Sequence, residues 1–235
     1  MSNIAPNKKN VLVIENVSKV VTSPEGPLTI LSNINFIVTQ GESVAIVGAS
    51  GAGKSTLLGL MAGLDIASSG HIFLNDQDLT EMDEDQRAEV RAKNVGFVFQ
   101  SFHLIPSLNA LENVMLPLEL NNKTSAKRHA QNILNQLGLK ARVQHYPHQL
   151  SGGEKQRVAI ARAFAAEPTI LFADEPTGNL DSQTGHDVMQ LFHNLHDQGQ
   201  TIILITHENE VAAEAQRTIF IKDGLIESDT TKEKK

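Results

Sequence analysis

The stretch Val44-Ala45-Ile46-Val47-Gly48-Ala49-Ser50-Gly51-Ala52-Gly53-Lys54-Ser55-Thr56 decides the fold. It begins as a short apolar strand, continues as a loop of the form G-x-x-x-x-G-K-[ST], and runs into a predicted helix over residues 55–64. Glycines let the backbone N–H groups of such a loop approach phosphate oxygens, and the helix N-terminus adds partial positive charge. We therefore predict a phosphate-binding loop; a glycine-rich turn that only caps the helix is the weaker alternative.

Within this loop, two side chains have chemistry of their own. Lys54 offers a mobile positive charge for β- and γ-phosphates, and the Ser55 hydroxyl can ligate Mg²⁺. The predicted nucleotide-binding residues of the loop are Gly48, Ala49, Ser50, Gly51, Ala52, Gly53, Lys54, Ser55 and Thr56.

Short β-branched runs recur along the chain, with helical patterns between most of them. They are residues 11–17, 44–47, 95–99, 169–172 and 201–206. This alternation predicts an α/β fold with a mostly parallel sheet, whose active loops lie at the carboxyl ends of its strands.

Two regions depart from that alternation. Residues 28–38 follow the turn-rich segment 23–27 without an intervening helix, so we expect an antiparallel β patch at the start of the domain. Between residues 100 and 164 the β signal disappears, and residues 108–118 and 126–137 carry helix-like apolar spacing. We predict one domain over residues 1–235, with a core of about 1–99 and 165–235 and an inserted helical subdomain of about 100–164. Residues 230–235 are expected to be a solvated tail.

The composition excludes several classes of protein. The 235 residues include no cysteine, so disulfides and thiolate chemistry are excluded, and the formal net charge of −7 argues against binding of nucleic acid. The start, MSNIAPNKKN, lacks the apolar region of a secretory signal, and the longest apolar stretches have the length of strands. We therefore expect any membrane association to come through a partner.

Two adjacent acids follow the apolar run Ile170-Leu171-Phe172-Ala173. Neighbouring strand residues point in opposite directions, so Asp174 and Glu175 are expected to have different tasks. Asp174 is predicted to hold Mg²⁺ through its water shell, and Glu175 to act as the general base for an attacking water. A pair of solvated acids at a strand end is the alternative, but the phosphate-binding loop earlier in the chain makes it weaker.

A second glycine pair lies in Leu150-Ser151-Gly152-Gly153-Glu154, at the start of a predicted helix that ends near residue 165. Ser151 and Glu154 have the spacing of a capping box, which is the simplest explanation of those two residues. It does not explain two glycines in the first turn, each of which costs about 0.5–1 kcal/mol relative to alanine. Bare backbone there indicates the close approach of an anion.

These five residues resemble the signature of the ABC ATPases, LSGG followed by a polar residue. The resemblance implies a P-loop NTPase fold with a RecA-like parallel core, and a head-to-tail homodimer with two composite ATP sites. Each site would combine the Lys54 side of one copy with the Ser151 side of the other, so Ser151, Gly152 and Gly153 are expected to contact nucleotide.

The remaining motifs of that family follow in order. Gln100 matches the Q-loop glutamine that senses Mg²⁺, Asp181 matches the D-loop, and His207 matches the histidine that contacts the γ-phosphate. By this resemblance the catalytic residues are Glu175, His207, Gln100 and Lys54, and the metal-binding residues are Ser55, Gln100 and Asp174. The cofactors are expected to be ATP and Mg²⁺.

Other stretches narrow the resemblance to the LolD, FtsE and MacB group of ABC ATPases, and within it to the YbbA type. They include Leu111-Glu112-Asn113-Val114 and the residues that surround Gln100 and Asp174. This group implies an ATPase subunit that drives a permease of the lipoprotein-release or mechanotransmission type from the cytoplasmic face of the inner membrane. The segment Phe102-His103-Leu104-Ile105-Pro106 is expected to receive the permease, although its apolar residues could instead be a buried anchor.

One position departs from the family pattern. An aromatic residue often stacks on adenine after the first strand, but Val20 and Val21 occupy the corresponding place. We therefore expect poor discrimination between ATP and GTP. The rival functions are a non-transport ABC ATPase acting in DNA repair or on ribosomes, and a P-loop kinase or GTPase, which would have no use for the Ser151 motif.

Overall fold

The computed structural model of the chain describes residues 9–24 and 26–232. Its strands are β1 (Asn10–Ser23), β2 (Gly26–Thr39), β3 (Ser43–Val47), β4 (Ser69–Leu74), β5 (Gln77–Asp78), β6 (Val95–Phe99), β7 (Ile170–Asp174), β8 (Thr201–Thr206), β9 (Arg217–Lys222) and β10 (Leu225–Thr231). Its helices are α1 (Lys54–Met61), α2 (Glu84–Asn94), α3 (Ala110–Leu120), α4 (Ala126–Gln136), α5 (Gly152–Ala165), α6 (Ser182–Asp197) and α7 (Asn209–Ala212), with short 3-10 helices η1 (Lys140–Arg142) and η2 (Pro147–Gln149).

The larger sheet has the strand order β10-β9-β3-β8-β7-β6, and every neighbouring pair except β9 with β10 is parallel. All residues of β3 and β8 are buried, as expected of central parallel strands covered on both faces. One face packs against α1 and the N-terminal strands, and the other packs against α5 and α6. The predicted mostly parallel α/β sheet is confirmed.

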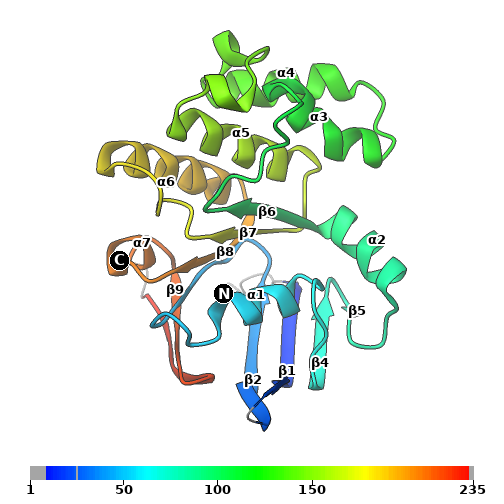
Figure 1. Cartoon of the computed structure of the whole chain (residues 1–235), viewed down its shortest axis with the longest axis vertical. Coiled ribbons are helices and arrows are strands. Elements are labelled where there is room, and N and C mark those ends of the chain that lie inside the picture. The colour runs from blue at the N-terminus through cyan, green and yellow to red at the C-terminus, as the bar shows by residue number, and fades with distance from the viewer. Residues whose placement is uncertain (1–8, 25, 233–235) are drawn as a thin grey trace, which may run out of the picture.

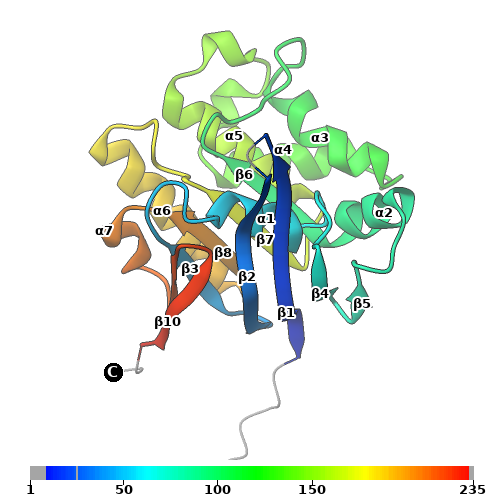
Figure 2. The same cartoon turned by 60° about the horizontal axis from the view of Figure 1, so that its bottom comes forward.

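The smaller sheet is antiparallel and has the order β2-β1-β4-β5. Figure 2 shows β1 and β2 side by side in front of α1. Their inward residues, among them Leu12, Ile14 and Leu31, join α1 in the largest apolar cluster of the molecule. The expected antiparallel β patch is therefore confirmed, and it forms one wall around the start of α1.

The helices α3, α4 and α5 gather at the opposite end of the molecule (Figure 1). They share an apolar cluster of their own, which includes Val114, Leu134 and Val158. Ile160, only about half a turn further along α5, faces the sheet and lies in its cluster instead. The predicted helices are present. Because α5 belongs to both clusters, the boundaries of the helical subdomain near residues 100 and 164 stay a prediction.

Two local expectations need correction. The helix expected to reach residue 64 ends at Met61, followed by Gly63 in the left-handed region with φ 66°. Thr230 and Thr231 are exposed to solvent, but they belong to β10 and not to a tail, because they pair with Thr218 and Arg217 in β9. Residues 233–235 of that expected tail and residues 1–8 lie outside the described residues. Within the described ranges, no helix combines the length and apolar character needed to cross a bilayer.

Candidate active site

A cavity of about 760 Å³ lies where β3, β7 and β8 end. Loops at the carboxyl ends of parallel strands are the usual ligand site of such sheets, and this volume suits a small-molecule ligand. The lining residues are Ile30, Ala49, Ser50, Gly51, Gly53, Lys54, Ser55, Thr56, Asp174, Glu175 and His207. The structure thus brings together the phosphate-binding loop, both acids and the histidine.

The glycines of the loop satisfy packing as well as ligand access. A Cβ at Gly48 would lie 2.2 Å from the carbonyl oxygen of Ile221 in β9. Gly53 adopts a φ of 98°, and a Cβ there would lie 2.7 Å from Cδ2 of Leu31. Gly48 and the buried Ala52 form the underside of the loop and do not line the cavity.

The start of α1 is suited to bind an anion. Its N-cap is Gly53, so no side chain accepts a hydrogen bond from the first backbone N–H groups of the helix. The buried Lys54 curls back over the loop, where its Nζ donates to the carbonyl oxygens of Gly48 (2.8 Å) and Ala49 (2.9 Å). Backbone donors and a lysine charge therefore converge on one side of the cavity.

The two acids have different environments. Asp174 is the last residue of β7, and burial, followed by the charge of Glu175, raises its pKa, while Lys54 acts in the opposite direction. Glu175 has left the strand: its φ is 46°, and its backbone N–H donates to the carbonyl oxygen of Ile205 at 2.8 Å. Strand alternation therefore does not decide how the two side chains are arranged, because Glu175 lies in this left-handed turn, and both acids line the same cavity.

His207 follows β8 and faces Glu175. Its Nδ1 lies 2.7 Å from Oε1 of Glu175, although more than half of the imidazole side chain is exposed. An ionised Glu175 can only accept a hydrogen bond, so Nδ1 carries the proton in this pair. The histidine can therefore orient the carboxylate while its Nε2 remains available to another group.

Some predicted site residues lie outside the cavity lining. Gln100 packs against Gly178, where a Cβ would lie 2.6 Å from its Nε2, and its carbonyl oxygen accepts a hydrogen bond from Nδ2 of Asn179 at 3.0 Å. Ser151, Gly152 and Gly153 also do not line it. Ile30 of β2 lines the cavity without having been predicted, because no sequence signal shows which residue of an antiparallel strand faces the loop.

The predicted capping box at the start of α5 is confirmed. Ser151 Oγ accepts from the Glu154 N–H at 3.3 Å, and Glu154 Oε2 accepts from the Ser151 N–H at 2.8 Å. Arg142 Nε donates to the other carboxylate oxygen at 2.6 Å and, with the capping bond, lowers the pKa of Glu154 to about 2. Glu154 therefore anchors the first turn of α5 to the segment before it.

Gly153 has a reason to be glycine within this chain. A Cβ there would lie 2.4 Å from the Cγ2 methyl of Thr184 on α6. Thr184 is held in place by Asp181, the N-cap of α6, whose carboxylate accepts from the Thr184 N–H at 3.0 Å and from its hydroxyl at 2.6 Å. The contact between α5 and α6 therefore requires glycine at position 153, whether or not an anion approaches this backbone as the sequence predicts.

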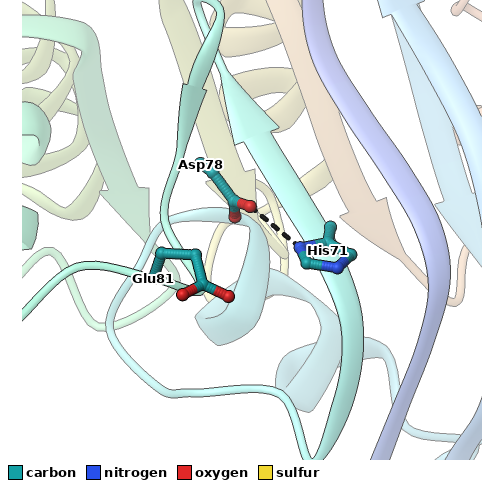
Figure 3. A group of neighbouring side chains, drawn as sticks. All are labelled: His71, Asp78 and Glu81. Carbon is teal, nitrogen blue, oxygen red and sulfur yellow. Dashed lines mark hydrogen bonds and ion pairs between the residues drawn. The ribbon is translucent and has the colours of Figure 1, made fainter.

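Another group of possible metal ligands lies away from this cavity, on the hairpin of β4 and β5 (Figure 3). His71 Nδ1 and Asp78 Oδ2 are 2.8 Å apart, and the other Asp78 oxygen accepts from the Thr80 N–H at 2.9 Å. Glu81, the third member, is exposed. Both oxygens of Asp78 already have hydrogen-bond partners in this region, so the cluster is explained as a contact that stabilises the pairing of β4 with β5.

Comparison with known proteins agrees with this geometry. The ABC transporter family model matches residues 31–178. The chain is 50% identical to the uncharacterized ABC transporter ATP-binding protein YbbA of Escherichia coli (strain K12), over 94% of the chain and 98% of that protein. It is 45% identical to the macrolide export ATP-binding/permease protein MacB of Shewanella sp. (strain W3-18-1), over 95% of the chain and 35% of that protein.

A solved structure has the same fold. It is the dimeric structure of a post-hydrolysis state of the ATP-binding cassette MJ0796 bound to ADP and Pi, with a TM-score of 0.86 and 39% identity over 94% of this chain and 98% of that one. Fold, cavity and sequence similarity lead to the same conclusion. The chain belongs to the ABC transporter family and is one of its ATP-binding ATPases.

Proposed function

We propose that this chain is the ATPase subunit of a transporter, that it dimerises head-to-tail around ATP, and that it drives a membrane permease of the lipoprotein-release or mechanotransmission type. One observation carries the proposal. The cavity joins a phosphate-binding loop to a general base, while Ser151, Gly152 and Gly153 lie outside its lining. A second copy could supply those residues, and the MJ0796 relatives are dimers.

The proposed reaction is attack of water on the γ-phosphorus of ATP. Glu175 accepts a proton from the water as the new P–O bond forms, and the bond from the γ-phosphorus to its bridging oxygen breaks, leaving ADP and phosphate. His207 holds the Glu175 carboxylate through the 2.7 Å hydrogen bond. Lys54 and the N–H groups at the start of α1 offset the charge on the transferred group.

The residues also suit Mg²⁺, a cation that prefers oxygen ligands. Ser55 and Asp174 line the same cavity. Asp174 is the last residue of β7, which is the position expected of a Walker-B acid. When bound, Mg²⁺ would neutralise phosphate charge. Gln100 would join Ser55 and Asp174 as a ligand of Mg²⁺ only if its side chain moved from its present contact with Gly178.

The permease is proposed on the basis of the relatives. The MacB relative is named as an ATP-binding and permease protein in one chain, of which this chain matches about a third. We propose that a separate permease holds this subunit at the cytoplasmic face of the inner membrane and docks near residues 102–106. Phe102, Leu104 and Ile105 are each half-buried, and Leu104 packs on the helical cluster, so the segment combines an internal anchor with a partly exposed surface.

The substitution Glu175→Gln tests the enzymatic part of this proposal. The amide keeps the size of the side chain but cannot accept the proton, so ATP should bind normally while turnover falls by about 100-fold or more. The trapped nucleotide should also hold two copies together, which light scattering after gel filtration would detect. A variant that hydrolyses ATP at the parent rate would remove Glu175 from this role, and a strictly monomeric ATP-loaded variant would refute the dimer.

A non-transport ABC ATPase is the alternative function. The acidic net charge and the MacB relatives favour transport over action on DNA or ribosomes. Affinity purification from detergent-solubilised membranes separates the two, since transport requires an integral membrane protein to co-purify with this chain in stoichiometric amounts.

A further inference from the structure

The segment proposed to receive the permease has an unusual backbone. Phe102 and His103 both lie in the left-handed region, with φ 62° and φ 45°. Non-glycine residues rarely adopt this conformation, and two in succession require that the surroundings hold them. Local contacts supply part of this support: the Phe102 N–H donates to the carbonyl oxygen of Phe99 at 3.0 Å, and the rings of Phe99 and His103 meet edge to face with centroids 4.9 Å apart.

Arg162 adds two side-chain hydrogen bonds to this support. From the last turn of α5, one guanidinium nitrogen donates to the carbonyl oxygen of His103 at 2.6 Å and another to that of Phe102 at 3.1 Å. Among the described residues no carboxylate forms an ion pair with Arg162, and burial lowers its pKa. The rigid fork of this side chain therefore binds two consecutive carbonyls of the left-handed turn and nothing acidic.

A buried asparagine fixes the other side of the segment. Asn113, fully buried on α3, accepts from the Ile105 N–H at 2.8 Å and donates to the carbonyl oxygen of Ile105 at 3.2 Å. Residues 102–105 are thus attached to α5 at one end and to α3 at the other. A force applied to this segment would reach both helices.

The helix α5 links this segment to the active site. It starts at the Ser151 capping box, and Gly152 and Arg162 are separated by about 15 Å along its axis. Between them, the fully buried Gln156 donates from Nε2 to the carbonyl oxygen of Pro176 at 2.7 Å, just after Glu175. The last turn of this helix therefore contacts the proposed permease segment, Gln156 contacts the backbone next to Glu175, and the first turn contains the glycines proposed to meet ATP across the dimer.

We propose that Arg162 is a positioning residue that locks the left-handed turn at Phe102 and His103 to α5, so that movement of a docked permease is transmitted along this helix to Gly152. The inference rests on the proposed function for its permease, but the lock itself lies within one chain. Two measurements therefore separate the two ideas.

The first measurement is hydrogen exchange of the backbone amides of residues 101–106 in the purified chain. Arg162→Gln keeps polar atoms but loses the fork and the charge, so exchange in this segment should rise about tenfold, whereas Arg128→Gln, at an exposed arginine of α4, should change nothing there. Adding His103→Gly to Arg162→Gln should restore part of the protection, because glycine adopts the left-handed region without strain. Unchanged exchange in Arg162→Gln, or no rescue by the glycine, would overturn the lock.

The second measurement uses the permease that co-purifies with the parent chain, reconstituted in nanodiscs. The ratio of ATPase activity with and without permease should fall severalfold in Arg162→Gln and stay at the parent value in Arg128→Gln. A faster-exchanging segment with an unchanged ratio would overturn the transmission role. If the permease does not stimulate even the parent chain, the proposed function fails, while the exchange data still decide whether the lock exists.

Discussion

Gly153 offers a direct test of why the start of α5 carries glycines. In Gly153→Ala the new Cβ would lie 2.4 Å from Cγ2 of Thr184, about 1 Å closer than an ordinary contact. Since Thr184 is held by Asp181 at the N-terminus of α6, the methyl cannot simply turn away. We therefore expect the substitution to push α5 and α6 apart.

The magnitude follows from two opposing effects. Overpacking by one methyl group costs about 1–3 kcal/mol, and replacement of glycine by alanine in a helix returns about 0.5–1 kcal/mol. The expected net loss is about 1–2 kcal/mol in the free energy of unfolding. At Gly152 the nearest atom to a new Cβ is Cδ2 of Leu180 at 3.3 Å, at the end of a flexible side chain, so Gly152→Ala should be close to neutral.

Urea denaturation of a double-mutant cycle provides the assay. Thr184→Ser removes the methyl in question and keeps the hydroxyl that binds Asp181. In that background Gly153→Ala should cost less than about 0.5 kcal/mol, which gives a coupling energy of about 1–2 kcal/mol. Equal urea midpoints for Gly153→Ala and the parent would refute the packing explanation. Loss of ATPase activity in such a stable variant would instead favour direct contact with nucleotide.

Three further predictions concern charge and base recognition. Glu154→Gln should lower the free energy of unfolding by about 1 kcal/mol at neutral pH, because it weakens the bond to Arg142. Since the pKa of Glu154 is lowered to about 2, the difference between the variant and the parent in urea titrations should vanish as the pH falls from about 4.5 to 2. Arg217→Gln should cost about 2 kcal/mol without changing turnover, since it removes a bidentate pair with Asp229, which thermal unfolding and an ATPase assay would show. Competition binding should give dissociation constants for ATP and GTP within about tenfold, since the described residues that line the cavity include no Phe, Tyr or Trp to stack on a base; a large preference for ATP would contradict this.

Local patterns in the sequence predicted the elements that carry chemistry. The loop before Lys54, the two acids at the end of β7 and the capping box at Ser151 each depend on residues within a few positions of one another, so strand, turn and helix propensities could be combined. The central strands were predicted because burial on both faces makes them continuously apolar.

Elements that depend on distant partners were missed. The strand β10 has the exposed, polar sequence LIESDTT and is a strand only because it pairs with β9. In the same way, the short strand β4 depends on its pairing with β1, and β5 depends on its pairing with β4. Strand order and Ile30 at the cavity likewise follow from register, which a single sequence does not encode locally.

Glu175 and Gly153 show a deeper limit, because each satisfies two requirements at once. The left-handed backbone of Glu175 aims its carboxylate at His207, yet no residue preference reveals that conformation, since glutamate is not a residue that favours it. Glycine at position 153 suits both a proposed contact with nucleotide and the lack of space beside Thr184. A glycine required for packing within one chain and a glycine required for contact with the nucleotide of a second chain look the same in a sequence. Only variants such as Gly153→Ala combined with Thr184→Ser separate the two causes.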